Sequence, residues 1–248
     1  MRVGYIFIFL FSLLLFSCSK TIHVAQTKVT GYELTNKAVS PDAEIAAIIA
    51  PYKESLDEEM NEIIGEVSSR MEKGKPESTL CNWVADAVME MASGRFDKPI
   101  DFAVQNYGGI RIGSISPGPL TKGKIFELMP FDNLVSIVEV PGIYVDSLLT
   151  RFAASGGWPV SKELRFQISN RKPVSVMIGG KPFDLSNTYT IAMPDYIANG
   201  GDNMHFLKGL ERTDLDYLIR DALIGFAEIE SGRGNQIKGK MDKRIVIQ

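Results

Sequence analysis

Strand-like and helix-like segments follow one another from residue 42 to the C-terminus without a strict strand–helix–strand alternation. Apolar residues recur at helical spacing over residues 45–60, 80–91, 145–152 and 218–229. Short runs rich in β-forming residues lie between them, at 63–71, 100–105, 134–140, 164–168, 174–178, 189–193 and 244–247. A doubly wound parallel sheet would need a helix between successive strands. This order instead predicts an α+β domain of layered mixed sheet and helices.

Several helices carry signals at their ends. Residues 40–42 supply a capping serine, a proline at the first helical position and an acidic residue, so we expect a long packed helix to begin there. Ser78 is the expected cap of the helix over 80–91, which Gly94 ends. Thr121 begins a short helix, and residues 213–214 are expected to cap the helix that carries 218–229.

The N-terminus differs in composition from the rest. Residues 3–16 form a near-continuous apolar run, shorter than the ~20 residues that span a membrane comfortably, which predicts an export signal rather than an ordinary helix of the protein. The segment ending at Cys18 resembles a bacterial lipobox, in which the signal is removed and the cysteine is lipidated. We therefore expect a lipoprotein signal peptide at 1–17, a tether at 18–39 and the folded domain at 40–248, anchored to the membrane and not spanning it.

Charge and residue counts exclude several classes of protein. Lys and Arg number 27 against 30 Asp and Glu, so no basic surplus exists for a nucleic-acid partner. The two histidines, His23 and His205, are too few for a two-metal hydrolase site, and we expect His205 to be a surface or packing residue. Once Cys18 carries lipid, Cys81 has no disulfide partner, and its apolar surroundings in sequence favour a buried packing role over a reactive thiol.

Three segments place glycine or aromatic residues after predicted strands, where backbone can approach a ligand. They are Asn-Tyr-Gly-Gly-Ile-Arg at 106–111, Pro-Phe-Asp-Asn at 130–133, and the segment 195–203 with Asn-Gly-Gly-Asp. In this order they resemble the C-terminal domain of the 5′-nucleotidase family, which includes UDP-sugar hydrolases and cyclic-nucleotide phosphodiesterases of the bacterial periplasm. The resemblance extends to Glu77-Ser78 and to the helix with Asn82 and Asp86, and covers residues 42–247.

The resemblance implies a nucleotide pocket. Asn106 and Arg111 match residues that touch the base or ribose and the phosphate, and the planar fork of arginine suits phosphate oxygens. Phe131 matches one wall of a clamp on the base, with Asn133 beside it. Taken singly, Arg111 could be a surface ion pair and Phe131 a core aromatic.

The third segment completes the implied pocket. Tyr196 stands where the family has its second aromatic wall, and each stacked base is worth ~1 to 3 kcal/mol. Asp202 matches the acid that accepts hydrogen bonds from ribose hydroxyls. The alternatives are a core tyrosine and an aspartate that stabilises its own glycine turn.

Two departures from the family pattern bear on activity. The family has a further phosphate-facing arginine just before Glu77, where this chain reads Lys73-Gly74-Lys75-Pro76, so a lysine would act as a point charge. The preceding metallophosphatase domain of the family, with its histidine-rich metal motifs, has no counterpart here. We expect no catalytic residue, metal ligand or cofactor in this chain, and two divalent metals in a separate catalytic domain.

These observations predict the nucleotide-recognition half of a 5′-nucleotidase or UDP-sugar hydrolase type of enzyme, lipid-anchored in the bacterial cell envelope and facing the periplasm. It would select nucleoside phosphates for a separate metallophosphatase chain. Whether this chain by itself is an enzyme stays open. The alternatives are a lipoprotein that binds nucleosides or nucleotides without a catalytic role, and a structural lipoprotein that has lost the pocket.

Overall fold

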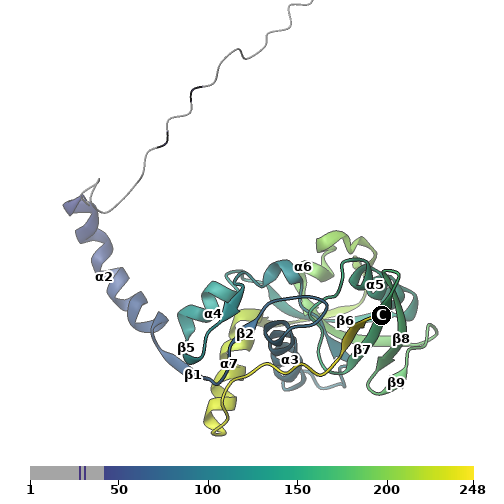
Figure 1. The fold of residues 1–248 in the computed structure, drawn as a ribbon. Helices are drawn as coiled ribbons and strands as arrows, with labels where there is room; N and C mark the ends of the chain where they lie inside the picture. Colours follow the sequence, from purple (N-terminus) through teal and green to yellow (C-terminus); the bar gives the residue numbers. More distant parts are fainter. Residues whose placement is uncertain (1–27, 29–30, 32–41) are drawn as a thin grey trace, which may run out of the picture. The chain divides into compact units, whose positions relative to one another are not determined.

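The computed structural model describes residues 28, 31 and 42–248 (Figure 1). The predicted signal peptide, Cys18, the tether, His23 and residues 40–41 lie outside this part of the chain. No helix among the described residues is both long and apolar enough to span a bilayer. Residues 50–248 form a compact unit distinct from residues 1–49.

Helix α2, Ala43–Met60, forms over the segment with helical spacing, but its start and surroundings differ from the prediction. Asp42 caps the helix, because its Oδ1 accepts hydrogen bonds from the backbone N–H groups of Glu44 and Ile45 at 3.0 and 3.1 Å. No residue of α2 is buried, and Tyr52 is 77% exposed. Among the residues that the structure describes, the apolar stripe of α2 is therefore not packed, contrary to the expectation of a packed helix.

A four-stranded sheet with the order β11-β6-β10-β3 forms the centre of the unit. Its strands are β11 (Arg212–Leu218), β6 (Leu134–Pro141), β10 (Thr188–Pro194) and β3 (Phe102–Ala103). Strand β6 is antiparallel to both neighbours, whereas β10 and β3 are parallel. The mixed sheet confirms the predicted α+β class, although the strand expected at 100–105 has only two residues.

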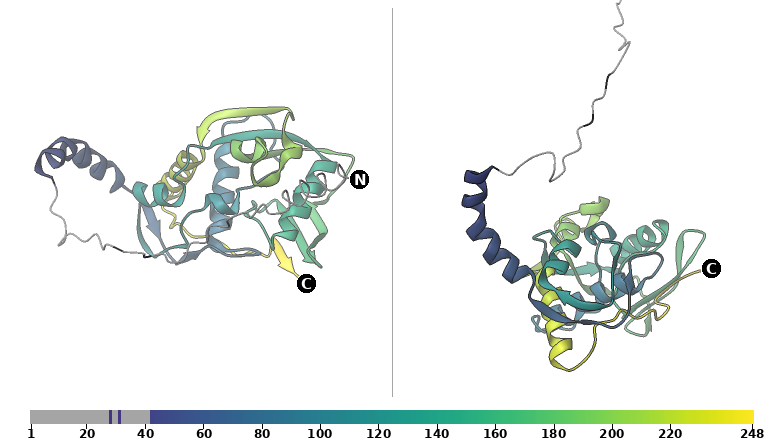
Figure 2. Two further views of the ribbon diagram at one scale, coloured as in Figure 1. Left: turned by 90° about the horizontal axis from the view of Figure 1, so that it is seen from above. Right: turned by 60° about the vertical axis from the view of Figure 1, so that its left-hand side comes forward.

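Alternation along these strands produces two cores, one on each face of the central sheet. Ala103 and Ala192 belong to one core, and their neighbours Phe102 and Ile191 belong to the other. Helices α3 (Thr79–Ser93) and α7 (Ile219–Gly232) lie side by side over the first face (Figures 1 and 2). Helix α5 (Gly142–Ala154) covers the second face and contacts the outer sheet.

The outer sheet has the order β12-β7-β8-β9. Its strands are β12 (Ile245–Ile247), β7 (Leu164–Ser169), β8 (Lys172–Ile178) and β9 (Lys181–Pro182). Strands form over both predicted runs, 164–168 and 174–178, and β7 pairs with β8 in antiparallel; Asn170 and Arg171 form the turn between them, both with positive φ. The C-terminal strand β12 returns beside β7 in parallel.

Two smaller ladders connect the remaining strands. Strand β1 (Ile63–Val67) pairs with β5 (Gly118–Thr121), and β2 (Met71–Glu72) pairs with β4 (Ser114–Ile115). The single strand expected at 63–71 is therefore two strands with different partners. Helix α4 (Lys122–Leu128) begins at Thr121 as predicted, with the Thr121 hydroxyl accepting from the Lys124 N–H.

The helix-cap prediction is correct for α3 and wrong for α7. The Ser78 hydroxyl accepts from the backbone N–H of Cys81 at 3.3 Å, and Gly94 ends the helix. Residues 213–214 instead lie in β11, paired with β6, where charged and less polar residues alternate with the period of a strand. Helix α7 begins at Ile219 after Leu218, without a capping side chain.

Candidate functional site

The three segments singled out from the sequence meet at one end of the central sheet. Strands β3 and β10 are parallel and end there, while antiparallel β6 begins there, with Val135 opposite Pro194. Residues 106–111 follow β3, residues 130–133 precede β6, and the short helix α6 (Asp195–Ala198) follows β10 (Figure 1). Topology thus gathers segments that lie up to about a hundred residues apart in the chain.

Asn106 lies beneath the turn η2 (Tyr107–Gly109) and is only 6% exposed. Its side-chain oxygen accepts a hydrogen bond from Gln105 Nε2 at 2.9 Å. A Cβ at Gly109 would come within 2.6 Å of that oxygen, so this turn needs glycine to pack on the amide. The buried position leaves Asn106 little surface for a ligand.

Arg111 and Phe131 lie together on the surface. The Arg111 guanidinium carbon is 5.6 Å from the Phe131 ring centroid, within the range of a cation–π contact. Its Nη1 also donates to the carbonyl of Gly108 at 3.3 Å. Phe131 is 40% exposed and therefore is not a core aromatic. Asn133, half-buried at the start of β6, holds α7 by accepting the Ile219 N–H with its backbone carbonyl.

Tyr196 and Asp202 form a second pair on the neighbouring loop. The Tyr196 hydroxyl donates to Asp202 Oδ1 at 3.2 Å and accepts the Asp202 N–H at 3.3 Å. Tyr196 is 43% exposed, so it too is outside the core. A Cβ at Gly201 would collide with the Tyr196 ring, and Gly200 has φ of +85°, so both glycines shape this turn.

A cationic group that the sequence only hinted at surrounds Tyr107. Lys73 Nζ and Lys75 Nζ lie 4.1 and 4.7 Å from the centroid of the Tyr107 ring. They also donate to the backbone carbonyls of Ile110 and Ser155, at 2.6 and 2.7 Å. The lysines were visible in the sequence as substitutes for an arginine, but nothing in the motif indicated that the tyrosine would lie against both.

The surroundings of Lys73 and Lys75 disfavour their charged forms. Burial lowers the pKa of Lys73, and the positive charges of Arg111 and Lys75 lower it further. Burial also lowers the pKa of Lys75. In the part of the chain that the structure describes, none of the three cations forms a salt bridge, so Arg111 is not the surface ion pair considered above. Neighbouring cations without a carboxylate favour an anion as their counterpart.

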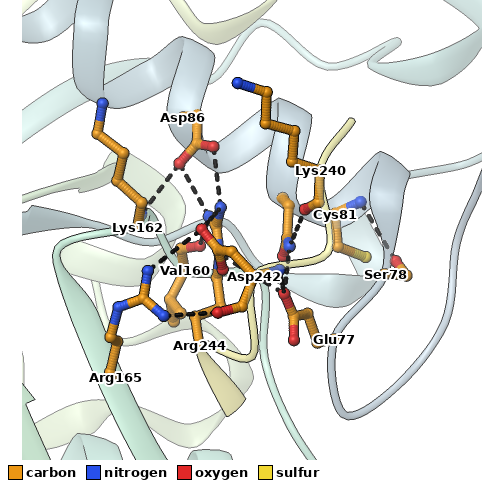
Figure 3. Close-up of polar contacts among 11 residues, drawn as sticks. Glu77, Ser78, Cys81, Asp86, Val160, Lys162, Arg165, Lys240, Asp242 and Arg244 are labelled. Carbon is orange, nitrogen blue, oxygen red and sulfur yellow. Dashed lines mark hydrogen bonds and ion pairs between the residues drawn. The ribbon is translucent and has the colours of Figure 1, made fainter. Parts of the chain in front are cut away.

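Glu77, just before helix α3, and Asp86, within it, accept hydrogen bonds from the C-terminal segment. Figure 3 shows Glu77, Asp86, Asp242 and Arg244, which together with Asn82 we call the Arg244 network. Arg244 is 1% exposed; burial alone would lower its pKa, but hydrogen bonds and charge from Asp86 and Asp242 outweigh it and raise the pKa. The arrangement joins α3 to the segment before β12.

Cys81 and His205 are two described side chains whose chemistry would suit a nucleophile or a metal ligand. Cys81 is buried, as expected, and burial raises the pKa of its thiol above the ordinary 9.0. His205 is exposed in the turn η4 (His205–Leu207). Across residues 28, 31 and 42–248, no three or more His, Cys, Asp and Glu side chains gather in a way that could hold a metal ion.

Comparison with known proteins identifies the family of the domain that carries these residues. Residues 58–209 match the family model described as the 5′-nucleotidase C-terminal domain. A 5′-nucleotidase of Vibrio vulnificus is 28% identical over 69% of this chain, and one of Vibrio parahaemolyticus is 30% identical over 66%. The matched regions span 31% and 30% of those two relatives.

Solved structures show the same fold. The crystal structure of a 5′-nucleotidase precursor from Thermus thermophilus superposes with a TM-score of 0.67 and 23% identity, over 84% of this chain and 44% of that one. A second similar structure, the NAD nucleotidase of Haemophilus influenzae, gives a TM-score of 0.61 and 21% identity, over 84% of this chain and 41% of its own.

Proposed function

Because the chain belongs to the 5′-nucleotidase family through its C-terminal domain at residues 58–209, we propose that it recognises nucleoside phosphates for hydrolysis. The observation that carries the proposal is the cationic group of Lys73, Lys75 and Arg111 at the end of the central sheet. A phosphate dianion would supply the negative charge that these side chains lack. Arg111 can bind two phosphate oxygens with its fork, and the lysines act as point charges.

The nucleoside would extend from the phosphate toward the exposed aromatic rings. Phe131 lies against Arg111, so a base stacked on Phe131 places its phosphate within reach of the guanidinium. Tyr196 supplies a second exposed ring on the adjacent loop, and Asp202, already bonded to its hydroxyl, keeps a second oxygen for ribose hydroxyls. Asn133 is a candidate polar contact to the base, whereas buried Asn106 packs against Gly109 of the neighbouring turn.

The residues of this site do not fit a divalent metal, since two lysines and an arginine would repel it. We therefore propose that the two metals of the hydrolytic reaction belong to a metallophosphatase domain on a separate chain. The relatives are about three times longer than the region they share with this chain, so they have room for such a domain outside that region. This chain would bind and orient the nucleotide and take no part in activating water.

A binding experiment tests the recognition role. The full chain in detergent is titrated with AMP and with adenosine by calorimetry. We expect AMP to bind more tightly than adenosine, and Arg111→Ala to remove most of that preference. Lys98→Ala, which disrupts an exposed ion pair with Glu139, serves as a charge-matched control and should leave both affinities unchanged. Failure of the wild-type chain to bind either ligand contradicts the proposal.

A turnover experiment tests the two-chain arrangement. The purified chain should release no phosphate from AMP, with or without divalent metal. Phosphate should be released only after a metallophosphatase chain is added. Metal-dependent turnover by the pure chain would show that the catalytic groups lie within it. AMP binding without any metallophosphatase partner in the source cells would favour the alternative of a binding lipoprotein.

We also propose that the chain is lipid-anchored and faces the periplasm, with a signal peptide at 1–17, lipid on Cys18, a tether at 18–39 and the folded domain at 40–248. The support is the lipobox-like sequence alone. Cys18→Ser should abolish incorporation of labelled palmitate and release the protein from washed membranes. Continued labelling of the variant would exclude Cys18 as the lipid acceptor.

A further inference from the structure

We propose that Glu77 is a positioning residue for the phosphate end of the nucleotide: the Arg244 network holds Glu77, and Glu77 fixes the loop that carries Lys73 and Lys75. This inference rests on the proposed function, because the anion at the two lysines is the nucleotide phosphate. It gives a ligand-directed role to the family-like residues of α3, which do not themselves face the pocket.

The loop 73–77 is short and is fixed at both ends. Its first residue, Lys73, donates its backbone N–H to the carbonyl of Gly113 at 2.9 Å. Directly after its last residue, Ser78 caps helix α3. In the middle, the backbone of Pro76 lies so close to Gly157 that a Cβ there would collide with the Pro76 carbonyl oxygen. Because Lys73 and Lys75 both project from this short loop, the backbone position of the loop sets the position of the two lysine side chains.

Glu77 is the side chain that fixes the loop to the rest of the fold. Its side chain is 4% exposed, and its Oε1 accepts from Asn82 Nδ2 at 2.7 Å and from the backbone N–H of Asp242 at 2.8 Å. The carboxylate of Asp242 in turn binds Arg244 at 2.9 and 3.0 Å. As Figure 3 shows, Glu77 thus points toward the C-terminal segment.

The direction of Glu77 matters electrostatically as well. Glu77 is two residues from Lys75 in sequence, and a free carboxylate at this place could pair with either lysine and neutralise the anion site. The hydrogen bonds from Asn82 and Asp242 hold the Glu77 carboxylate at the C-terminal segment instead. The network therefore both places the lysines and keeps the Glu77 carboxylate away from them.

The test compares Glu77→Ala with Glu77→Gln in the full chain. Both variants remove the negative charge, but glutamine keeps an oxygen that accepts the two hydrogen bonds. We expect Glu77→Ala to weaken AMP binding about tenfold, as for a misplaced charge-assisted hydrogen bond, with adenosine binding unchanged. Glu77→Gln should restore most of the AMP affinity. The same substitution at exposed Glu72, five residues away, is the control and should change neither affinity.

Each outcome separates the explanations. If Glu77 acts only by repelling the phosphate with its negative charge, both variants bind AMP more tightly than the wild type. That result overturns the inference. If Glu77 only stabilises the fold, the melting temperature falls but the ratio of AMP to adenosine affinity stays constant, which also overturns it. If wild-type chain binds neither ligand, the proposed function itself fails.

A second variant covers the case in which Glu77→Ala does not fold. Asn82→Ala removes one of the two donors to Glu77 and leaves the Asp242 N–H in place. We expect a smaller loss of AMP affinity, about threefold, again without a change for adenosine. A folded Asn82→Ala protein with the wild-type ratio of the two affinities would contradict the positioning role.

Discussion

The guanidinium of Arg244 meets the carboxylate of Asp86 through two parallel hydrogen bonds of 2.8 and 3.0 Å, across 158 residues of sequence. Arg244 also donates to Asp242 and to the carbonyl of Val160 at 2.8 Å, so all five of its N–H donors are used. The last strand of the chain is thereby fixed to a helix near the start of the domain. A buried ion pair of this kind leaves uncompensated charge when one partner is removed.

Arg244→Met should therefore lower the free energy of unfolding by ~3 to 5 kcal/mol, because Asp86 and Asp242 would lose their shared cation. Urea unfolding followed by far-UV circular dichroism measures this change. Lys98→Ala removes an ion pair whose side chains are 69% and 38% exposed, and should cost less than ~1 kcal/mol. Similar losses for the two variants would show that the Arg244 network adds no more than a surface pair.

Phe131→Ala should affect binding far more than stability. The ring is 40% exposed, so truncating it should cost less than about 1 kcal/mol of folding free energy. Loss of a stacked base should weaken adenosine binding by ~1 to 3 kcal/mol. The matched control is Phe152→Ala, a ring that is 1% exposed, for which we expect ~3 to 5 kcal/mol of destabilisation.

Thermal melts and calorimetric titrations of these two phenylalanine variants together show whether Phe131 serves binding or stability. A Phe131→Ala protein that melts much lower yet binds adenosine normally, at a temperature where it is folded, would remove Phe131 from the nucleotide pocket.

The elements predicted correctly from the sequence are those whose local signals agree with their tertiary environment. The cap at Ser78 and the buried strand β6 are examples, since capping and hydrophobicity are local properties. Strand β11 was missed because Thr213 and Asp214 suit a helix cap equally well. Only pairing with β6 at the sheet edge makes them strand residues.

The candidate site shows the same division. The motifs containing Arg111, Phe131 and Asp202 single out three loops as candidates, but they do not show that these loops share one end of a sheet, which depends on the order of strands in space. The contacts of Lys73 and Lys75 with Tyr107 depend on the path of the loop before α3. The apolar stripe of α2 predicted burial, yet periodicity shows only that one face is apolar and not what covers it.

Cys81 should make the free energy of unfolding fall as the pH rises into the alkaline range. Burial raises the pKa of its thiol, so above the ordinary value of 9.0 the unfolded chain loses a proton that the folded chain keeps. Stability is then fully present below pH 9.0 and falls as the pH rises toward the folded-state value, by at most ~1.4 kcal/mol per pH unit. Cys81→Ala removes this dependence, so the wild type should lose stability relative to the variant. Urea titrations at pH 8 and about pH 10 measure the difference, and parallel curves would contradict it.

Lys73 should make AMP affinity depend on pH in a range where an exposed lysine would not. Its pKa is lowered, mainly by burial; Cys81 opposes this shift, while Arg111 and Lys75 add to it, so in the free protein Lys73 loses its proton below the ordinary 10.5. A bound phosphate favours the protonated lysine, and the affinity therefore falls as the pH rises past the free-state pKa. Burial raises the pKa of the neighbouring Tyr107 above 10.0, so its ring stays neutral in this range.

The comparison that isolates this group is Lys73→Arg, since a guanidinium keeps its charge at every accessible pH. We expect the ratio of AMP to adenosine affinity to fall between about pH 8 and pH 10 in the wild type and to fall less in the variant. Adenosine is the internal control, because it lacks the phosphate and should bind equally across the range. An AMP preference that stays constant to pH 10 in the wild type would mean that Lys73 does not contact the phosphate, leaving Arg111 and Lys75 to hold it.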